Sequence, residues 1–374
     1  MFILEEPYVS NLMKQTLINN NFKVYDNKIA RLISDKFNFT TDLNNKIYSN
    51  SENSIGIVAQ TDENSDLNSM IAVCKDKYEF RNRLMNLYPD FFFEEIPIED
   101  LEDLDITDFP MPFIIKPTVG FLSMGVHKVN SLDEWQSVLT QIQNEIINFK
   151  SAFPENVLSS TSFIVEEAIE GDEYAIDAYY DADGNPVIMN IFRHPFNGGG
   201  DVSDRIYLTS KNIIKEHLAE FQKLLIQIGK NLCFKNFPIH IEVRKRDDGV
   251  IIPIEINPMR FAGWCTTDIM YYTYGINPYE YFENKLKPDW EKIFDDISDD
   301  TFYFAMAETP SDIDKSNIKF DYNKFMSEFS NILEFRKINY TEKPLFAMWF
   351  GNVKDEFEIN KILNVNMSDY ITRE

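Results

Sequence analysis

The chain has 374 residues, of which 44% are hydrophobic and 26% charged, with 36 Lys and Arg against 61 Asp and Glu. This composition supports a buried core shared by two or three associated domains and excludes a chain that is disordered throughout. The formal charge of -25 repels phosphate backbones and anionic lipid surfaces, so we expect neither a nucleic-acid nor a membrane partner.

The cysteines and the first residues bear on the compartment. Cys74, Cys233 and Cys265 have no metal-finger spacing and lie in apolar or aromatic contexts, which is typical of buried free thiols. The start MFILEEPYVS lacks a basic segment and a long apolar run, and such features mark secreted or membrane-spanning chains. We therefore expect a cytoplasmic protein.

The first part of the chain, residues 1–74, alternates between strand-like and helix-like segments. FILEEP, the amphipathic stretch 11–19 and FKVYDN read as strand, helix and strand, and SIGIVAQ is a further apolar run before helical NSMIAVCKDK. This pattern predicts a small α/β lobe. A helix follows in DKYEFRNRLMNL, with an Asp start and a Tyr-Pro stop.

Residues 75–165 predict a second lobe. An acidic, proline-punctuated connection contains one short strand, and FPMPFIIKP, GFLSMG and VHKV then read as strand, glycine-flanked loop and returning strand. A helix follows, for which Ser131 and Glu134 have the spacing of a capping box.

Two hairpins organise residues 166–285, which we expect to form a large lobe. YAIDAYY and PVIMNIF are joined by DADGN, and PIHIEVRKR and VIIPIEINP are joined by a turn near Asp248; Asp-Gly is a strong hairpin signal. The long amphipathic helix KEHLAEFQKLLIQIGKNL lies between them. Residues 286–374 contain strand-like TFYFAMAE and LFAMWFG and are expected to form a C-terminal subdomain.

The second hairpin contains the strongest chemical pattern. Its turn places Glu242 almost directly opposite Glu255, and strand alternation puts Glu255 and Asn257 on one face. Two facing carboxylates repel, so we expect a cation between them, and oxygen ligands favour Mg²⁺ or Mn²⁺. A solvated polar face, or one carboxyl group with a raised pKa, is the alternative.

Upstream residues add features that suit a phosphorylated ligand. Lys116 lies in an apolar strand, where an ammonium group needs an anion such as phosphate. Gly120 and Gly125 then flank a loop whose backbone N–H groups can close over a phosphate. FIVEEAIEGDEYAID ends a strand in acids and a glycine bend, and such a strand end offers backbone groups to an adenine edge and, seven residues on, a carboxylate to ribose.

The order and spacing of these motifs resemble the ATP-grasp superfamily, in its D-alanine ligase and amino-acid ligase branches. The resemblance rests on KDK around Lys77, IIKP, GFLSMG, VEEAIEGDE, HIEV and IEINP, and it covers about residues 75–285. It implies an α/β ATP-grasp fold with a preceding N-terminal lobe and a C-terminal subdomain.

The resemblance also implies roles and cofactors, which are ATP and Mg²⁺ or Mn²⁺. Lys77 and Lys116 would contact the phosphates, and the loop with Gly120, Ser123 and Gly125 would cover them. The remaining implied sites are adenine binding by Glu166 and the backbone at Glu167 and Ile169, ribose binding by Glu173, and metal binding by Glu242, Glu255 and Asn257.

Four further residues are candidates for the substrate side. Arg260 follows Asn257 by three positions, and its implied role is to anchor a carboxylate or acyl phosphate; a salt bridge to an acid such as Asp268 is the alternative. Arg193 and Arg205 flank the glycine-rich break NGGGDVSD, where ordinary surface positions are the alternative. His240 stands two residues before Glu242, where several such ligases carry Arg.

The implied activity is an ATP-dependent ligase that joins a carboxylate to an amine or thiol through an acyl phosphate and releases ADP and phosphate. A phosphotransferase on the same fold and an inactive nucleotide-binding module are the alternatives. The expected partners are a small-molecule carboxylate and an amine, and a homodimer is compatible with the sequence.

Overall fold

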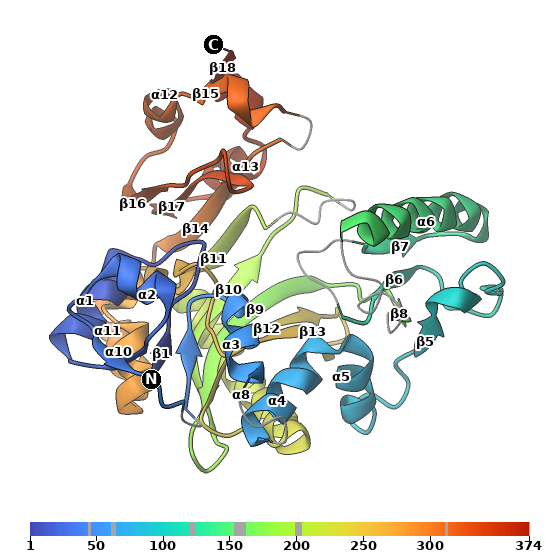
Figure 1. Cartoon of the computed structure of the whole chain (residues 1–374), viewed down its shortest axis with the longest axis horizontal. Helices are drawn as coiled ribbons and strands as arrows, with labels where there is room; N and C mark the ends of the chain where they lie inside the picture. Colours follow the sequence, from blue (N-terminus) through green and yellow to red (C-terminus); the bar gives the residue numbers. More distant parts are fainter. Residues whose placement is uncertain are drawn as a thin grey trace.

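The computed structural model describes residues 1–43, 46–60, 65–119, 125–152, 162–198, 204–310 and 313–373. Three sheets organise it (Figure 1): a small N-terminal sheet, a second small sheet on the far side of the molecule, and a long sheet that passes between them and continues upward into the C-terminal part. The predicted loop residues Gly120 and Ser123 lie outside the described residues.

The N-terminal sheet is parallel, with strand order β3-β2-β1-β4. Helix α1 begins after Ser10, whose side chain accepts a hydrogen bond from the Met13 N–H group, and it buries Met13 and Leu17. The predicted α/β lobe is present, and SIGIVAQ forms a short helix in it. The elements are β1 (Phe2–Ile3), α1 (Asn11–Asn19), β2 (Lys23–Tyr25), α2 (Lys28–Ile33), β3 (Asn38–Thr40), β4 (Tyr48–Ser49), η1 (Glu52–Ser54) and α3 (Ile55–Ala59).

Two helices connect this lobe to the next one. Asp76 ends α4 and begins α5, because its side chain accepts a hydrogen bond from the Glu79 N–H group. The Lys77 N–H group donates to the Thr118 carbonyl group of the second small sheet at 2.9 Å. Helix α5 is therefore fixed at the edge of that sheet. The bounds are α4 (Asp66–Lys75) and α5 (Lys77–Leu84).

The second small sheet is antiparallel, with order β5-β8-β6-β7. Phe113, Ile115, Phe163 and Val165 point to one face and pack in a core with Trp135 of α6. The residues between them, including Lys116 and Glu166, point to the other face. The elements are β5 (Phe93–Pro97), η2 (Ile98–Asp100), β6 (Phe113–Pro117), β7 (His127–Val129), η3 (Leu132–Glu134), α6 (Trp135–Ala152) and β8 (Ser162–Glu167).

The predicted capping box is wrong in detail. Ser131 precedes a single 3₁₀ turn and its side chain makes no capping hydrogen bond, so the α-helix begins later, at Trp135. Glu134 reaches back instead to the Asn130 N–H group at 2.9 Å.

The long sheet has eight strands, in the order β13-β12-β9-β10-β11-β14-β17-β16. Both predicted hairpins are present, and Gly184 and Gly249 supply the positive φ in their turns. The strands are β9 (Asp172–Tyr180), β10 (Pro186–His194), β11 (Ile206–Thr209), β12 (Phe237–Lys245), β13 (Ile251–Pro258), β14 (Thr301–Glu308), β16 (Ile332–Lys337) and β17 (Leu345–Val353).

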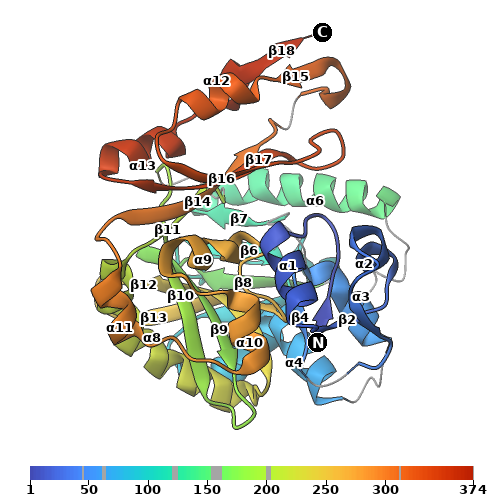
Figure 2. The same cartoon turned by 90° about the vertical axis from the view of Figure 1, so that its left-hand side faces the viewer.

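Helices cover both faces of this sheet. On one face Tyr180 packs against Gly229 of α8, where a Cβ atom would lie 2.1 Å from the tyrosine ring. Its neighbour Tyr179 points to the other face and donates to the Leu286 carbonyl group, just after α10. Figure 2 shows α9 and α10 in front of the strands and α8 behind them. The helices are α8 (Lys211–Leu232), η4 (Thr266–Asp268), α9 (Ile269–Tyr274), α10 (Pro278–Asn284) and α11 (Trp290–Asp296).

The C-terminal part contributes three strands of the same sheet, because β14 pairs with β11 of the large lobe. TFYFAMAE and LFAMWFG are strands β14 and β17, as predicted. A two-stranded sheet, β15 with β18, lies above them with α12 and α13 (Figure 2). The remaining elements are η5 (Lys315–Asn317), β15 (Ile318–Phe320), α12 (Tyr322–Ser327), α13 (Glu356–Leu363), η6 (Met367–Tyr370) and β18 (Ile371–Arg373).

The expectation that the cysteines are buried free thiols is confirmed at two positions and wrong at one. All three cysteines are free, and Cys74 and Cys265 are buried. Cys233 is exposed, because it ends α8 in a left-handed conformation at the surface.

Within the described ranges, none of the helices is long and apolar enough to cross a membrane.

Candidate active site

The two glutamates of the second hairpin face one another as predicted. Glu242 and Glu255 are direct partners in the register of β12 and β13, and the Asn257 amide donates to Glu255 Oε1 at 3.3 Å. The three side chains therefore form one oxygen-rich group on the face of the sheet that α8 does not cover.

The charges around Glu242 indicate a site for a cation. Burial, and then the negative charges of Glu255, Glu173 and Asp204, raise the pKa of Glu242 well above its usual range, although 20% of its side chain is exposed. Among the described residues no three or more His, Cys, Asp and Glu side chains are grouped to hold a metal alone. The two carboxylates and the amide suit Mg²⁺ whose remaining ligands are phosphate oxygens and water.

A buried aspartate orients His240 beside this group. His240 Nδ1 lies 2.7 Å from Asp177 Oδ1, and its Nε2 lies 3.7 Å from Glu242 Oε1. Asp177 is fully buried and also accepts hydrogen bonds from the Ala262 N–H group and the Thr267 hydroxyl group. The imidazole therefore has a fixed orientation towards the Glu242 carboxylate.

Lys116 has a protein anion as its partner. Its ammonium group binds Glu166 Oε1, and Arg81 Nε of α5 donates to Glu166 Oε2 at 2.7 Å. All three side chains are buried. Burial alone would raise the pKa of Glu166, but the two cations outweigh it and hold the pKa at about 2. The ammonium group has three donors, so Lys116 retains donors for a phosphate.

Lys77 lies in the same cluster of charges. Burial lowers its pKa, the charge of Glu255 opposes this effect, and Lys116 and Lys75 add to it. A half-buried ammonium group near a second one stabilises an incoming anion. The structure thus places Lys77 in one group of charges with Lys116 and with Glu255, which faces Glu242.

The predicted ribose carboxylate, Glu173, lies between two cationic side chains. Its neighbours in register are His194 on β10 and Arg244 on β12. His194 Nδ1 is 2.9 Å from Oε1, and Arg244 Nε donates to Oε2 at 2.9 Å. Burial opposes ionisation, but these two partners outweigh it and lower the pKa of Glu173.

Residues 168–171, the connecting bend, join β8 of the small sheet to β9 of the long sheet. Gly171 has φ of +113°, and a Cβ atom there would lie 2.1 Å from the Lys245 carbonyl oxygen, so only glycine fits. The N–H groups of Glu167 and Ala168 donate to Phe92 and Pro112.

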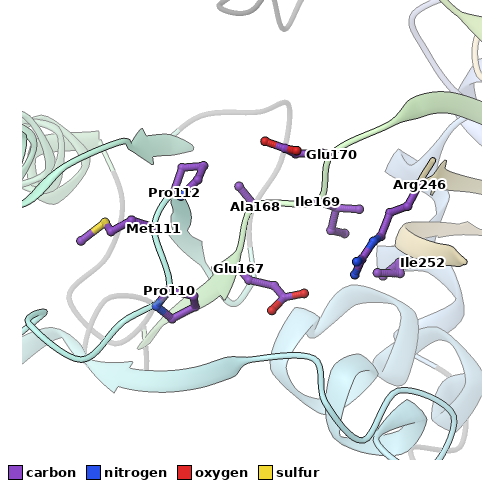
Figure 3. A pocket seen from close by; sticks show the side chains of 9 residues that line it. All are labelled: Pro110, Met111, Pro112, Glu167, Ala168, Ile169, Glu170, Arg246 and Ile252. Carbon is purple, nitrogen blue, oxygen red and sulfur yellow. The ribbon is translucent and has the colours of Figure 1, made fainter. Parts of the chain in front are cut away.

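A cavity of ≈ 370 Å³ borders this bend (Figure 3). It includes Glu167 and Ile169 of the predicted adenine segment but none of the predicted phosphate or metal residues. Figure 3 shows the loop before β6 on one side of it and the turn of the second hairpin on the other. The lining residues are Pro110, Met111, Pro112, Glu167, Ala168, Ile169, Glu170, Arg246 and Ile252.

Arg260 contacts an acid of the N-terminal lobe. Its Nε and Nη2 atoms donate to Glu52 Oε1 at 3.2 and 3.0 Å, and Lys75 binds the other oxygen. The proposed alternative partner, Asp268, is bound instead by Arg336 at 2.6 Å. The positive charge of Arg260 still acts on Glu242 and opposes the rise of its pKa.

The other two candidate arginines lie towards the C-terminal part. Arg193 is on the opposite face of β10 from His194, and its guanidinium group contacts Glu356 of α13 at 3.0 Å. Arg205 Nη1 donates to the Val365 carbonyl group at 3.3 Å. The positive φ of Gly125, +73°, fits the turn into β7, but the rest of its loop lies outside the described residues.

Sequence reasoning missed Arg81, Asp177 and Arg244. Strand alternation contained a signal for two of them: Arg244 follows Glu242 by two residues, and Asp177 follows Glu173 by four, so each shares the face of a predicted site residue. Arg81 lies on a helix 85 positions from Glu166, and no local pattern connects them.

Residues 109–268 match the family model described as an ATP-grasp domain. This span runs from the segment just before β6 to the end of η4 and contains every predicted phosphate, nucleotide and metal residue except Lys77. Residues 109–268 therefore form an ATP-grasp domain. The prediction of the ATP-grasp class is confirmed for these residues, and with it the predictions of an ATP-dependent enzyme and of ATP and Mg²⁺ as cofactors.

Solved structures share this fold over the length of the chain. L-amino acid ligase from Bacillus licheniformis has a TM-score of 0.72 at 15% identity, covering 100% of this chain and 98% of that chain. N5-carboxyaminoimidazole synthase from Aspergillus clavatus, in complex with ADP and 5-aminoimidazole ribonucleotide, has 0.62 at 11%, covering 97% and 96%. Phosphoribosylglycinamide synthetase from Anaerococcus prevotii has 0.59 at 12%, covering 100% and 98%. A search of curated proteins finds no match.

Proposed function

We propose that this protein is a carboxylate–amine ligase that uses Mg·ATP and forms an acyl phosphate. The single observation that carries the proposal is one group of charges, in which Lys77 at the start of α5 interacts with Lys116 of the small sheet and with Glu255, which faces Glu242 in the long sheet. Two cations near a pair of facing carboxylates suit a polyphosphate together with its metal ion.

Nucleotide binding is assigned to the region where the connecting bend meets β9. The Glu167 carbonyl and Ile169 N–H groups would meet the adenine edge, and Glu173 would accept the ribose hydroxyl groups. Glu166 supports this site indirectly, because it holds Lys116 and Arg81 in place. The cavity in Figure 3 borders the bend, but without the phosphate residues it is not assigned to the nucleotide.

Glu242, Glu255 and Asn257 would hold Mg²⁺, which supplies charge neutralisation for the phosphates when bound. In the proposed reaction a substrate carboxylate oxygen attacks the γ-phosphorus atom, the bond to the β-phosphate oxygen breaks, and ADP leaves. The amine nitrogen then attacks the acyl carbon atom, the C–O bond to phosphate breaks, and the amine loses a proton. Lys77 and Lys116 stabilise the charge that develops in the first step.

The carboxylate substrate is assigned to the region of Arg260. Its guanidinium group has a planar fork that suits a carboxylate, and Glu52 already holds it at 3.0 Å. The substrate therefore has to share or replace the Glu52 contact. The L-amino acid ligase fold supports an amino acid as one substrate. The cytoplasmic location stays a prediction, and a homodimer stays compatible with the sequence.

The test is a screen of carboxylates paired with amino acids in the presence of Mg·ATP, read out as phosphate release and as product mass. We expect ADP, free phosphate and a condensed product, and we expect Glu255→Gln to abolish all three while the fold is kept, because it removes a metal ligand. Asp248→Asn is the matched control, since Asp248 lies in the exposed turn of the same hairpin and pairs with Arg246.

Three outcomes contradict the proposal in different ways. ADP with a phosphorylated substrate and no free phosphate would identify a phosphotransferase. Unchanged phosphate release by Glu255→Gln would remove the metal assignment. Failure to bind Mg·ATP at all would exclude both the ligase and the phosphotransferase.

A further inference from the structure

Arg244 joins two segments to which nucleotide binding is assigned. Its Nε atom donates to Glu173 Oε2 at 2.9 Å, and its Nη1 atom donates to the Ile169 carbonyl oxygen of the connecting bend at 2.7 Å. An ion pair that only neutralised Glu173 would not need the second contact. Arg244 therefore fixes the bend relative to the carboxylate.

Glu173 has capacity left for a ligand. An ionised carboxylate accepts about four hydrogen bonds, and His194 and Arg244 occupy one position on each oxygen. The two partners flank Glu173 in direct register, so the carboxylate cannot turn towards either neighbouring strand. The acceptor positions that remain suit a pair of adjacent hydroxyl groups.

Access and rigidity agree with this arrangement. The side chain of Arg244 is 34% exposed, whereas that of Glu173 is 8% exposed, so Arg244 is the more accessible of the pair. The close approach of Gly171 to the Lys245 carbonyl group holds the bend directly against β12, next to Arg244. The bend, Arg244 and Glu173 thus form one unit.

We propose that Arg244 is a positioning residue for ribose recognition, which aims the Glu173 carboxylate at the two ribose hydroxyl groups of a nucleoside triphosphate. This inference rests on the proposed nucleotide site. It makes the preference for a full ribose over a dideoxyribose depend on Arg244.

The experiment measures the dissociation constants of Mg·ATP and of Mg·2′,3′-dideoxy-ATP by calorimetry on the full chain. Because hydrogen bonds to a charged group are involved, we expect wild type to prefer ATP by about tenfold or more. Arg244→Met should bring the ratio close to one, because ATP loses more affinity than dideoxy-ATP. Lys245→Met is the matched control: it lies next along β12, pairs with Glu220 and should keep the wild-type ratio.

Arg244→Lys provides a variant that keeps the charge if the Met variant does not fold. One ammonium group cannot reproduce the fork to Glu173 and Ile169, so this variant should also lose the ratio. Equal weakening of both nucleotides, or an unchanged ratio in the variants, would overturn the inference. A wild type that binds both nucleotides equally would overturn it while leaving the proposed function intact, and a wild type that binds neither would refute the proposed function itself.

Discussion

Glu166→Gln tests the buried cluster in which Glu166 binds Lys116 and Arg81. The substitution keeps the shape of the side chain but leaves Lys116 and Arg81 without a counter-charge. Arg81 and Lys116 hold the pKa of Glu166 at about 2 in the folded protein, which corresponds to about 3 kcal/mol of folding free energy at neutral pH. Uncompensated buried charges cost a similar amount, about 3–5 kcal/mol.

The pH dependence gives the expected sign. A carboxyl group whose pKa is lowered by folding stabilises the protein above its unfolded pKa, and this contribution disappears as the pH falls through the folded value. The difference in unfolding free energy between wild type and Glu166→Gln should therefore be full at pH 7, shrink below about pH 4.5 and approach zero near pH 2. Urea denaturation followed by circular dichroism at each pH measures it.

Glu79→Gln is the control for this experiment. Glu79 pairs with Arg83 on the same helix, but both side chains are exposed, so the change should cost less than about 0.5 kcal/mol. A difference for Glu166→Gln that stays constant from pH 7 to pH 3, or that is no larger than that of the control, would refute the reasoning.

Two further predictions concern packing and thiol reactivity. Gly229→Ala should lower the unfolding free energy by about 1–3 kcal/mol, because its Cβ atom would lie 2.1 Å from the Tyr180 ring. Gly56→Ala is the control, since nothing lies within 4 Å of its Cβ position, and it should not lower the unfolding free energy in thermal or urea melts. Equal losses in the two variants would contradict the packing argument. A thiol reagent should modify only Cys233 rapidly in the native protein, because burial raises the pKa of Cys265 to about 11 and that of Cys74 well above its usual range; fast modification that persists in Cys233→Ser would contradict this.

The sequence predicted those parts of the site that depend on short-range rules. Strand alternation and an Asp-Gly turn are enough to place Glu242 opposite Glu255, because the period of a strand is two and the turn fixes the register. The same rules predicted the first hairpin, and apolar runs predicted β14 and β17 of the C-terminal part.

Partners that come from distant parts of the chain were not predictable in this way. The anion beside Lys116 is Glu166, 50 positions away, and the acid beside Arg260 is Glu52, 208 positions away. Both arginine and lysine needed an anion on simple electrostatic grounds, but only the packing of three sheets decides which carboxylate supplies it. The capping box failed for a local reason, since a 3₁₀ turn took the place of the first helical turn.

The pairing of β11 with β14 makes the catalytic sheet and the C-terminal strands mechanically continuous. Their backbone hydrogen bonds run through four consecutive residue pairs, from Ile206 with Ala305 to Thr209 with Phe302. A displacement of the C-terminal part is therefore transmitted through β11 and β10 to the strands that hold Glu173 and Glu242.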